Sequence, residues 1–160
     1  MGHQPEINKS SRHSKITGDF TEALILYWLS KHGFECAQID HMGMDIIARN
    51  PTTAELMGIS VKSRSRVKGK EDDKVRIYRS DIRKLETACE TFACHPYFAV
   101  VVDAAPFIHC FITSATHLST LSGRRKHLAF RMTPKDLAAH ETDPEIRIFR
   151  FKYKTHRWWK

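Results

Sequence analysis

The sequence predicts a mixed α/β fold in which helices flank a β-sheet. Three observations support this: an apolar, helix-like stretch near the N-terminus, three short strand-like runs separated by turn residues, and a continuous apolar run over residues 97–103. Such an uninterrupted run is typical of a strand buried on both faces. With 160 residues, 41% of them hydrophobic, the chain is long enough for one domain with one core.

The first element is a helix. Residues 1–16 are polar without apolar periodicity, so we expect a flexible arm there and a single domain over residues 17–160. Thr17 or Asp19 can cap a helix that runs to about residue 32, where Gly33 ends it. Phe20 and all of residues 23–29 are apolar, which predicts a helix covered on most sides. Glu22 is the exception, a carboxylate on this helix.

The next elements form a meander. Residues 34–40, 45–49 and 56–62 read as strands, joined by a turn at Gly43 and an Asn-Pro turn at residues 50–51. The following residues, 63–76, are so polar that we expect an exposed loop.

The second half adds a helix and more strands. Ser80 is the expected cap of a helix over residues 80–92, and residues 97–103 and 107–113 are expected to pair as strands. Short helices from Ser114 and Thr133 and a C-terminal edge strand with a basic tail follow. The predicted order is α-β-β-β-α-β-β, a core over residues 17–113 with a C-terminal extension over 114–160.

The charge is unevenly distributed. Residues 62–84 contain ten Lys or Arg and four acids, and residues 147–160 contain six Lys or Arg and no acid. Each stretch therefore carries +6 of a total of +8, which leaves −4 for the rest of the chain. This segregation suits a surface that binds a polyanion such as nucleic acid, although a basic surface that only keeps the protein in solution has the same composition.

Composition also argues against several classes of protein. The chain has no apolar run of about 18 residues and no hydrophobic stretch near its start, so we expect a soluble, cytoplasmic protein without a membrane partner. The four cysteines form no C-x-x-C pair, which favours reduced thiols over a zinc site.

Asp45, Ser60 and Lys62 are the candidate site residues on the strands. Because side chains alternate along a strand, Ser60 and Lys62 share the face opposite to that of Ile59 and Val61. The turn would bring Asp45 near Lys62, and Glu22 lies on the helix that has to cover this sheet. Two carboxylates and a lysine suit phosphodiester hydrolysis assisted by Mg²⁺ or Mn²⁺.

These residues resemble the PD-(D/E)XK nuclease superfamily, in its Holliday-junction-resolvase-like and restriction-endonuclease-like branches. The resemblance covers residues 17–113 and rests on "GDFTEALILYWLSKHGFE", "GMDIIA" and "ISVKSRSR". It implies a restriction-endonuclease-like core. It also implies that Glu22 and Asp45 bind the metal, that the backbone carbonyl of Val61 is a further ligand, and that Lys62 is the catalytic lysine.

Ser60 departs from the pattern of that superfamily, which has Glu, Asp or Gln two residues before the lysine. A hydroxyl is a weaker ligand than a carboxylate for a hard cation. An acid from another element is a conceivable substitute, and the candidates are Glu86 and the acids at 71–73. Glu55 is excluded because it is an odd number of residues from Ser60 and would face the other way.

The leading hypothesis is a metal-dependent endonuclease that hydrolyses phosphodiester bonds in DNA, including branched or structured DNA, with RNA the less favoured partner. The residues expected to bind the nucleic acid are basic: Arg64, Arg66, Lys68, Lys70, Arg124 and Arg125. A homodimer is expected because such enzymes cut two strands. One alternative is a nuclease-fold module that lost hydrolysis through Ser60 and binds DNA or RNA by its basic surface. A basic protein-interaction domain is another alternative.

Overall fold

The computed structural model describes residues 8–122 and 126–155. The elements of the first half are α1 (His13–Lys31), β1 (Glu35–His41), β2 (Met44–Arg49), β3 (Leu56–Ser65), β4 (Val75–Tyr78) and α2 (Arg79–Phe92). The second half contains β5 (His95–Ala104), β6 (Phe107–Ser114), α3 (Ala115–Ser122), β7 (His127–Phe130), α4 (Pro134–Thr142) and β8 (Arg147–Lys152). The predicted mixed α/β class and the predicted order of the core elements are confirmed, with β4 added between β3 and α2.

The main sheet has six strands in the order β1-β2-β3-β5-β6-β8. Its pairs are antiparallel except β3 with β5, which run parallel because α2 crosses over between them. The predicted meander and the predicted C-terminal edge strand are therefore both present. β4 and β7 form a separate two-stranded sheet.

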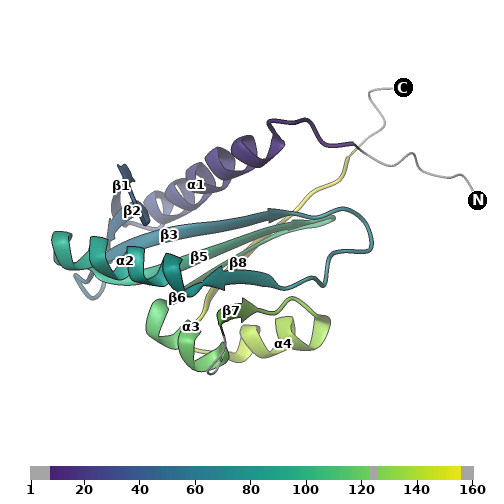
Figure 1. Cartoon of the computed structure of the whole chain (residues 1–160). Coiled ribbons are helices and arrows are strands. Elements are labelled where there is room, and N and C mark those ends of the chain that lie inside the picture. The colour runs from purple at the N-terminus through teal and green to yellow at the C-terminus, as the bar shows by residue number, and fades with distance from the viewer. Residues whose placement is uncertain (1–7, 123–125, 156–160) are drawn as a thin grey trace, which may run out of the picture.

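The helices cover the two faces of the main sheet unequally (Figure 1). α1 packs Ile25 and Leu29 onto one face, against strand residues such as Ile59 and Val101. α2 and α3 cover the other face, where their apolar residues meet those of the β4–β7 sheet in a second core cluster. Tyr97 to Asp103 lies in the central strand β5, and its buried residues contribute to both clusters, as the apolar run predicted.

α1 differs from the prediction in its start and in its burial. It begins at His13, one turn before Thr17, and Thr17 donates to the His13 carbonyl inside the helix instead of capping it. Its outer face is open to solvent, with Phe20 49% and Tyr27 57% exposed. The expectation of a helix covered on most sides was wrong, because no further layer lies over α1 in the described residues.

The segment after Lys62 is also more ordered than predicted. β3 continues to Ser65, and β4 begins within the stretch expected to be a loop. β4 alternates buried Val75 and Ile77 with exposed Arg76 and Tyr78, so its inner face joins the core. The cap of α2 is Tyr78, without a side-chain hydrogen bond, so the expectation that Ser80 caps this helix was wrong.

Candidate active site

The site forms where β2 and β3 separate. The antiparallel ladder between them ends at the pair Ile46 and Ile59. Beyond that pair, the Val61 amide donates to Oδ2 of Asp45 at 2.7 Å, so the carboxylate takes the place of a backbone acceptor. This bond holds Asp45 against β3, next to Ser60 and Lys62.

Asp45 has a perturbed pKa. Burial raises it above the usual range, and three neighbours oppose this in part: the Val61 amide, the charge of Lys62 and the hydroxyl of Ser60. Ser60 is 4% exposed and donates to the carboxylate. A carboxyl that is partly buried next to a lysine is the kind of group found at functional sites.

Glu22 approaches from α1. Its carboxylate accepts a hydrogen bond from the Gln38 amide of β1 at 2.8 Å. Burial raises the pKa of Glu22, and the negative charge of Asp45 raises it further. The two predicted acids therefore lie close enough for their charges to repel each other.

Lys62 points to the opposite side of the sheet from α1. Ile59 and Val61 pack with the α1 cluster, whereas Nζ of Lys62 forms an ion pair with Oδ1 of Asp81 at 3.4 Å. The predicted alternation along β3 is thus confirmed. Asp81 belongs to the first turn of α2 and is half-buried together with the lysine, with 28% and 24% of their side chains exposed.

Sequence reasoning missed Asp81 as a partner of Lys62. The conceivable substitutes for the missing acid lie elsewhere: Glu71 accepts the Gly69 amide, and Glu86 acts on the thiol of Cys89. Glu55 accepts a hydrogen bond from the hydroxyl of Tyr97, at the other end of β3. The available signal for Asp81 was its place in the first turn of a helix that follows the strand with Lys62.

The donor set suits a hard divalent cation. Glu22 and Asp45 supply carboxylate oxygens, the ligands that Mg²⁺ and Mn²⁺ prefer, and a cation near them would relieve their mutual repulsion. The backbone amide of Val61 donates to Asp45. The backbone carbonyl of Val61 is the group predicted to be a metal ligand. The Ser60 hydroxyl donates a hydrogen bond to Asp45 and is neutral, so it adds no negative charge to the site.

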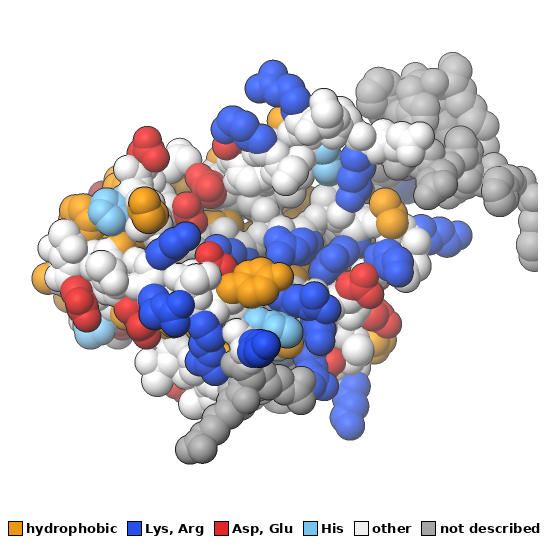
Figure 2. Space-filling view, viewed as in Figure 1, with side chains coloured by type: hydrophobic (Ala, Val, Ile, Leu, Met, Phe, Trp, Pro, Cys, Tyr) orange, Lys and Arg blue, Asp and Glu red, His pale blue; other side chains and the backbone are white. Residues whose placement is uncertain are grey.

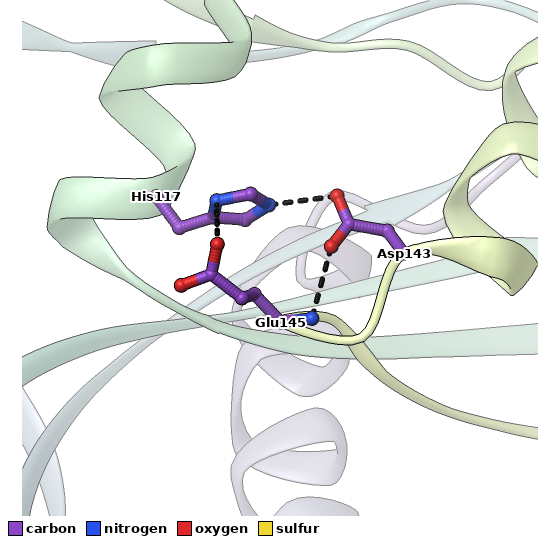
Figure 3. A group of neighbouring side chains, drawn as sticks. All are labelled: His117, Asp143 and Glu145. Atoms are coloured by element: carbon purple, nitrogen blue, oxygen red, sulfur yellow. Dashed lines mark hydrogen bonds and ion pairs between the residues drawn. The ribbon is translucent and has the colours of Figure 1, made fainter.

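A second cluster of titratable groups lies away from these residues (Figure 3). His117 of α3 contacts Asp143 through Nε2 at 2.7 Å and Glu145 through Nδ1 at 2.9 Å. His117, Asp143 and Glu145 are near enough to one another to be considered as metal ligands. However, the two ring nitrogens point in different directions, each toward its own carboxylate, so this geometry is that of a hydrogen-bonded clamp between α3 and the α4–β8 connection.

The basic residues after Lys62 lie over β4, α2 and the β3–β4 connection. Figure 2 shows a broad band of Lys and Arg side chains across this face, which we call the basic band. Lys68 and Lys70 are exposed, and Arg64 is half-buried. Arg66 instead donates to the carbonyls of Asp73 and Lys74, both at 3.1 Å, and so closes the β3–β4 loop.

Burial lowers the pKa of Arg66, an effect that the charge of Asp73 opposes and that of Arg64 reinforces. Arg66 is therefore a loop-closing residue in this structure. Arg124 and Arg125, the other predicted nucleic-acid contacts, lie outside the described residues.

Across the described residues, no helix is both long and apolar enough to cross a membrane. No protein-family model matches the sequence, and no curated protein matches it.

The comparison with solved structures does give a match. The chain is similar to Hjc of Archaeoglobus fulgidus, a Holliday junction resolvase from an archaeal hyperthermophile, with a TM-score of 0.56 and 19% sequence identity. The match covers 76% of this chain and 88% of the other. At this identity the likeness concerns the fold, and this chain therefore has a fold that a Holliday junction resolvase also has.

Proposed function

We propose that this protein is a metal-dependent endonuclease that hydrolyses phosphodiester bonds in branched or structured DNA. The observation that carries the proposal is that Asp45, which accepts the Val61 amide at 2.7 Å where β2 and β3 separate, interacts electrostatically with both Lys62 and Glu22. The fold shared with a Holliday junction resolvase supports a nuclease and suggests the substrate class.

Each residue has a role in this proposal. Glu22 and Asp45 would hold Mg²⁺ or Mn²⁺ together with the Val61 carbonyl. A bound divalent cation would lower the pKa of a water and polarise the scissile phosphate. Lys62 would orient the attacking water and offset the negative charge that builds up on the phosphate. Asp81 would position Lys62, because its carboxylate is the ion-pair partner of Nζ.

The basic band would bind the DNA backbone. We assign this role to Arg64, Lys68 and Lys70, and we assign Arg66 to closing the loop that carries the two lysines. Two strands have to be cut at a junction, so we propose that the active form is a homodimer, as light scattering of the purified protein would test.

Cleavage assays test the enzymatic proposal. Labelled linear, nicked and four-way-junction DNA would be incubated with the protein and Mn²⁺ or Mg²⁺, using Asp45→Ala, Lys62→Ala and the control Glu90→Ala, which changes an exposed acid near the end of α2. We expect metal-dependent cleavage by the wild type and the control. The two site variants should lose at least about two orders of magnitude in rate, because each removes a group that acts on the reacting phosphate.

One observation favours a second function, a DNA-binding module without hydrolysis. Ser60 occupies the position at which a third acid would be expected, and its neutral hydroxyl donates to Asp45. Binding that weakens steeply with salt, without cleavage in either metal, would select this module. The absence of any salt-dependent binding would rule out both functions.

A further inference from the structure

The two-stranded sheet β4–β7 presents an exposed aromatic ring within the basic band. Val75 and Ile77 face the core, so Arg76 and Tyr78 face outward. Tyr78 is 52% exposed, and its ring lies against that of its cross-strand partner His127, with centroids 6.2 Å apart and planes tilted by 58°. The Tyr78 ring thus has His127 as a neighbour, while more than half of the residue remains open.

The charges around this ring suit an anionic ligand. Arg76 is exposed two residues earlier on the same outer face, and Lys126 is exposed next to His127. Further exposed cations follow on α2 at Arg83 and Lys84. Figure 2 shows apolar and histidine side chains in the middle of a field of Lys and Arg on this face.

Aromatic rings among cations are the usual platform for an unpaired nucleotide. Every base has a π-face that can stack on an aromatic side chain, while the cations hold the phosphates on either side. A fully paired duplex keeps its bases inside, so it can use the cations but not the ring.

We propose that Tyr78, supported by His127, is a stacking platform for an unpaired base of a DNA substrate. The inference rests on the proposed function and deepens it, because it names single-stranded or gapped DNA as the preferred class. The platform lies close to the candidate active site: Tyr78 is the N-cap residue of α2, three residues before Asp81, which pairs with Lys62. A base held on Tyr78 would place a neighbouring part of its strand near Lys62.

Equilibrium binding without divalent metal tests the platform apart from cleavage. Fluorescence anisotropy would compare a fully paired duplex, the same duplex with a three-nucleotide gap, and a single strand, in EDTA. The variants are Tyr78→Ala and Tyr78→Phe, and the matched control is Tyr27→Ala, an equally exposed tyrosine on α1 at the other face of the sheet.

Loss of the ring should be selective. We expect Tyr78→Ala to weaken binding of the gapped and single-stranded DNA about 5- to 100-fold, with a change of less than about twofold for the duplex. Tyr78→Phe keeps the ring and should stay within about twofold of the wild type, as should Tyr27→Ala. A 2-aminopurine in the gap should be quenched on binding by the wild type and by Tyr78→Phe, but not by Tyr78→Ala.

Three results would overturn the platform: no change with Tyr78→Ala, an equal loss for duplex and gapped DNA, or an equal loss with Tyr78→Phe. If the wild type binds and cleaves DNA in these cases, the proposed function stands and only the platform falls. If the wild type binds none of the three DNAs, the platform falls, whereas the proposed function is decided separately by the cleavage assay on four-way-junction DNA.

Discussion

Asp45 is held in a position that its own charge disfavours. Burial raises its pKa, and its carboxylate lies near that of Glu22. A carboxyl whose pKa is higher in the folded than in the unfolded state binds a proton more readily when folded, so its ionised form opposes folding at neutral pH. This cost is expected at a site built to bind a cation.

Asp45→Asn should therefore stabilise the protein in the absence of metal. The amide oxygen of asparagine can still accept the Val61 amide, while the negative charge is removed. We expect the Tm in EDTA at pH 7 to rise by about 2–4 °C for each kcal/mol gained. Differential scanning fluorimetry with and without Mn²⁺ measures both effects, and Mn²⁺ should raise the Tm of the wild type only.

The sign of the pH dependence follows from the raised pKa. The advantage of Asp45→Asn over the wild type should shrink as the pH falls through the raised pKa of Asp45, because the wild-type carboxyl then becomes neutral as well. Asp72→Asn, in the exposed loop, is the control and should leave the Tm unchanged. A lower Tm for Asp45→Asn at pH 7 would show that its charge is already compensated.

Ser60 determines how many negative ligands the site has. It is buried and donates to Asp45, so Ser60→Glu would place a third carboxylate beside the first two. We expect this variant to bind Mn²⁺ about tenfold or more tightly by titration calorimetry, and to be less stable than the wild type without metal.

Ser60→Ala is the matched control for that experiment. It removes the hydroxyl without adding charge, so it should not tighten metal binding. Equal or weaker Mn²⁺ affinity in a folded Ser60→Glu protein would mean that residue 60 does not occupy a ligand position.

At the scale of single elements, the clamp around His117 connects α3 to the α4–β8 turn (Figure 3). Burial alone would raise the pKa of Asp143, but the Glu145 amide and His117 together bring it below its usual value. A lowered carboxyl pKa means that the ionised form stabilises the fold at neutral pH.

Asp143→Asn should destabilise the protein in a pH-dependent way. The stability gap to the wild type should be present above about pH 5 and should narrow as the pH falls below that, through the lowered pKa of Asp143. Urea unfolding between pH 3 and 7 measures this gap. Glu141→Gln, whose carboxylate pairs with Arg150 outside the clamp, is the control. If the stability difference between the wild type and Asp143→Asn does not narrow at low pH, the charge of Asp143 is not its cause.

The β4–β7 sheet shows why elements of this kind are hard to predict. Each strand has only four residues, and β4 lies within one of the most polar stretches of the chain. Val75 and Ile77 become strand residues because Leu128 and Phe130 of β7 pair with them from about fifty positions later. That contact is non-local, so neither local strand propensity nor the spacing of apolar residues predicts it.

At the scale of the whole molecule, the basic band should control DNA affinity through phosphate contacts. Each contact that is lost should reduce the slope of log K against log salt by about one. Lys68→Ala combined with Lys70→Ala should therefore lower this slope by about two, for duplex and gapped DNA alike. Filter binding or anisotropy between 50 and 300 mM salt measures the slope.

Lys31→Ala is the control for this pair. Lys31 is an exposed lysine at the end of α1, which lies on the opposite face of the sheet from α2. It should leave the slope unchanged. An unchanged slope in the Lys68 and Lys70 double variant would place the DNA elsewhere on the molecule.

Local signals in the sequence are sufficient to predict the architecture of the core and to name residues that could form a site. The meander, the crossover helix α2 and the buried strand β5 have strong local signals, namely turn residues, helical spacing and an uninterrupted apolar run. The side-chain period of two likewise placed Ser60 and Lys62 on one face of β3.

The tertiary structure sets the contacts that these residues make. It paired Lys62 with Asp81, turned Ser60 into a donor for Asp45, used Arg66 to close a loop, and set Tyr78 on His127. These contacts join elements that are distant in sequence, and they depend on where strands separate and on which helix face meets the sheet. The local spacing of side chains predicts on which face of a strand or helix a residue lies. The residues that it contacts on neighbouring elements are selected by packing of the whole domain.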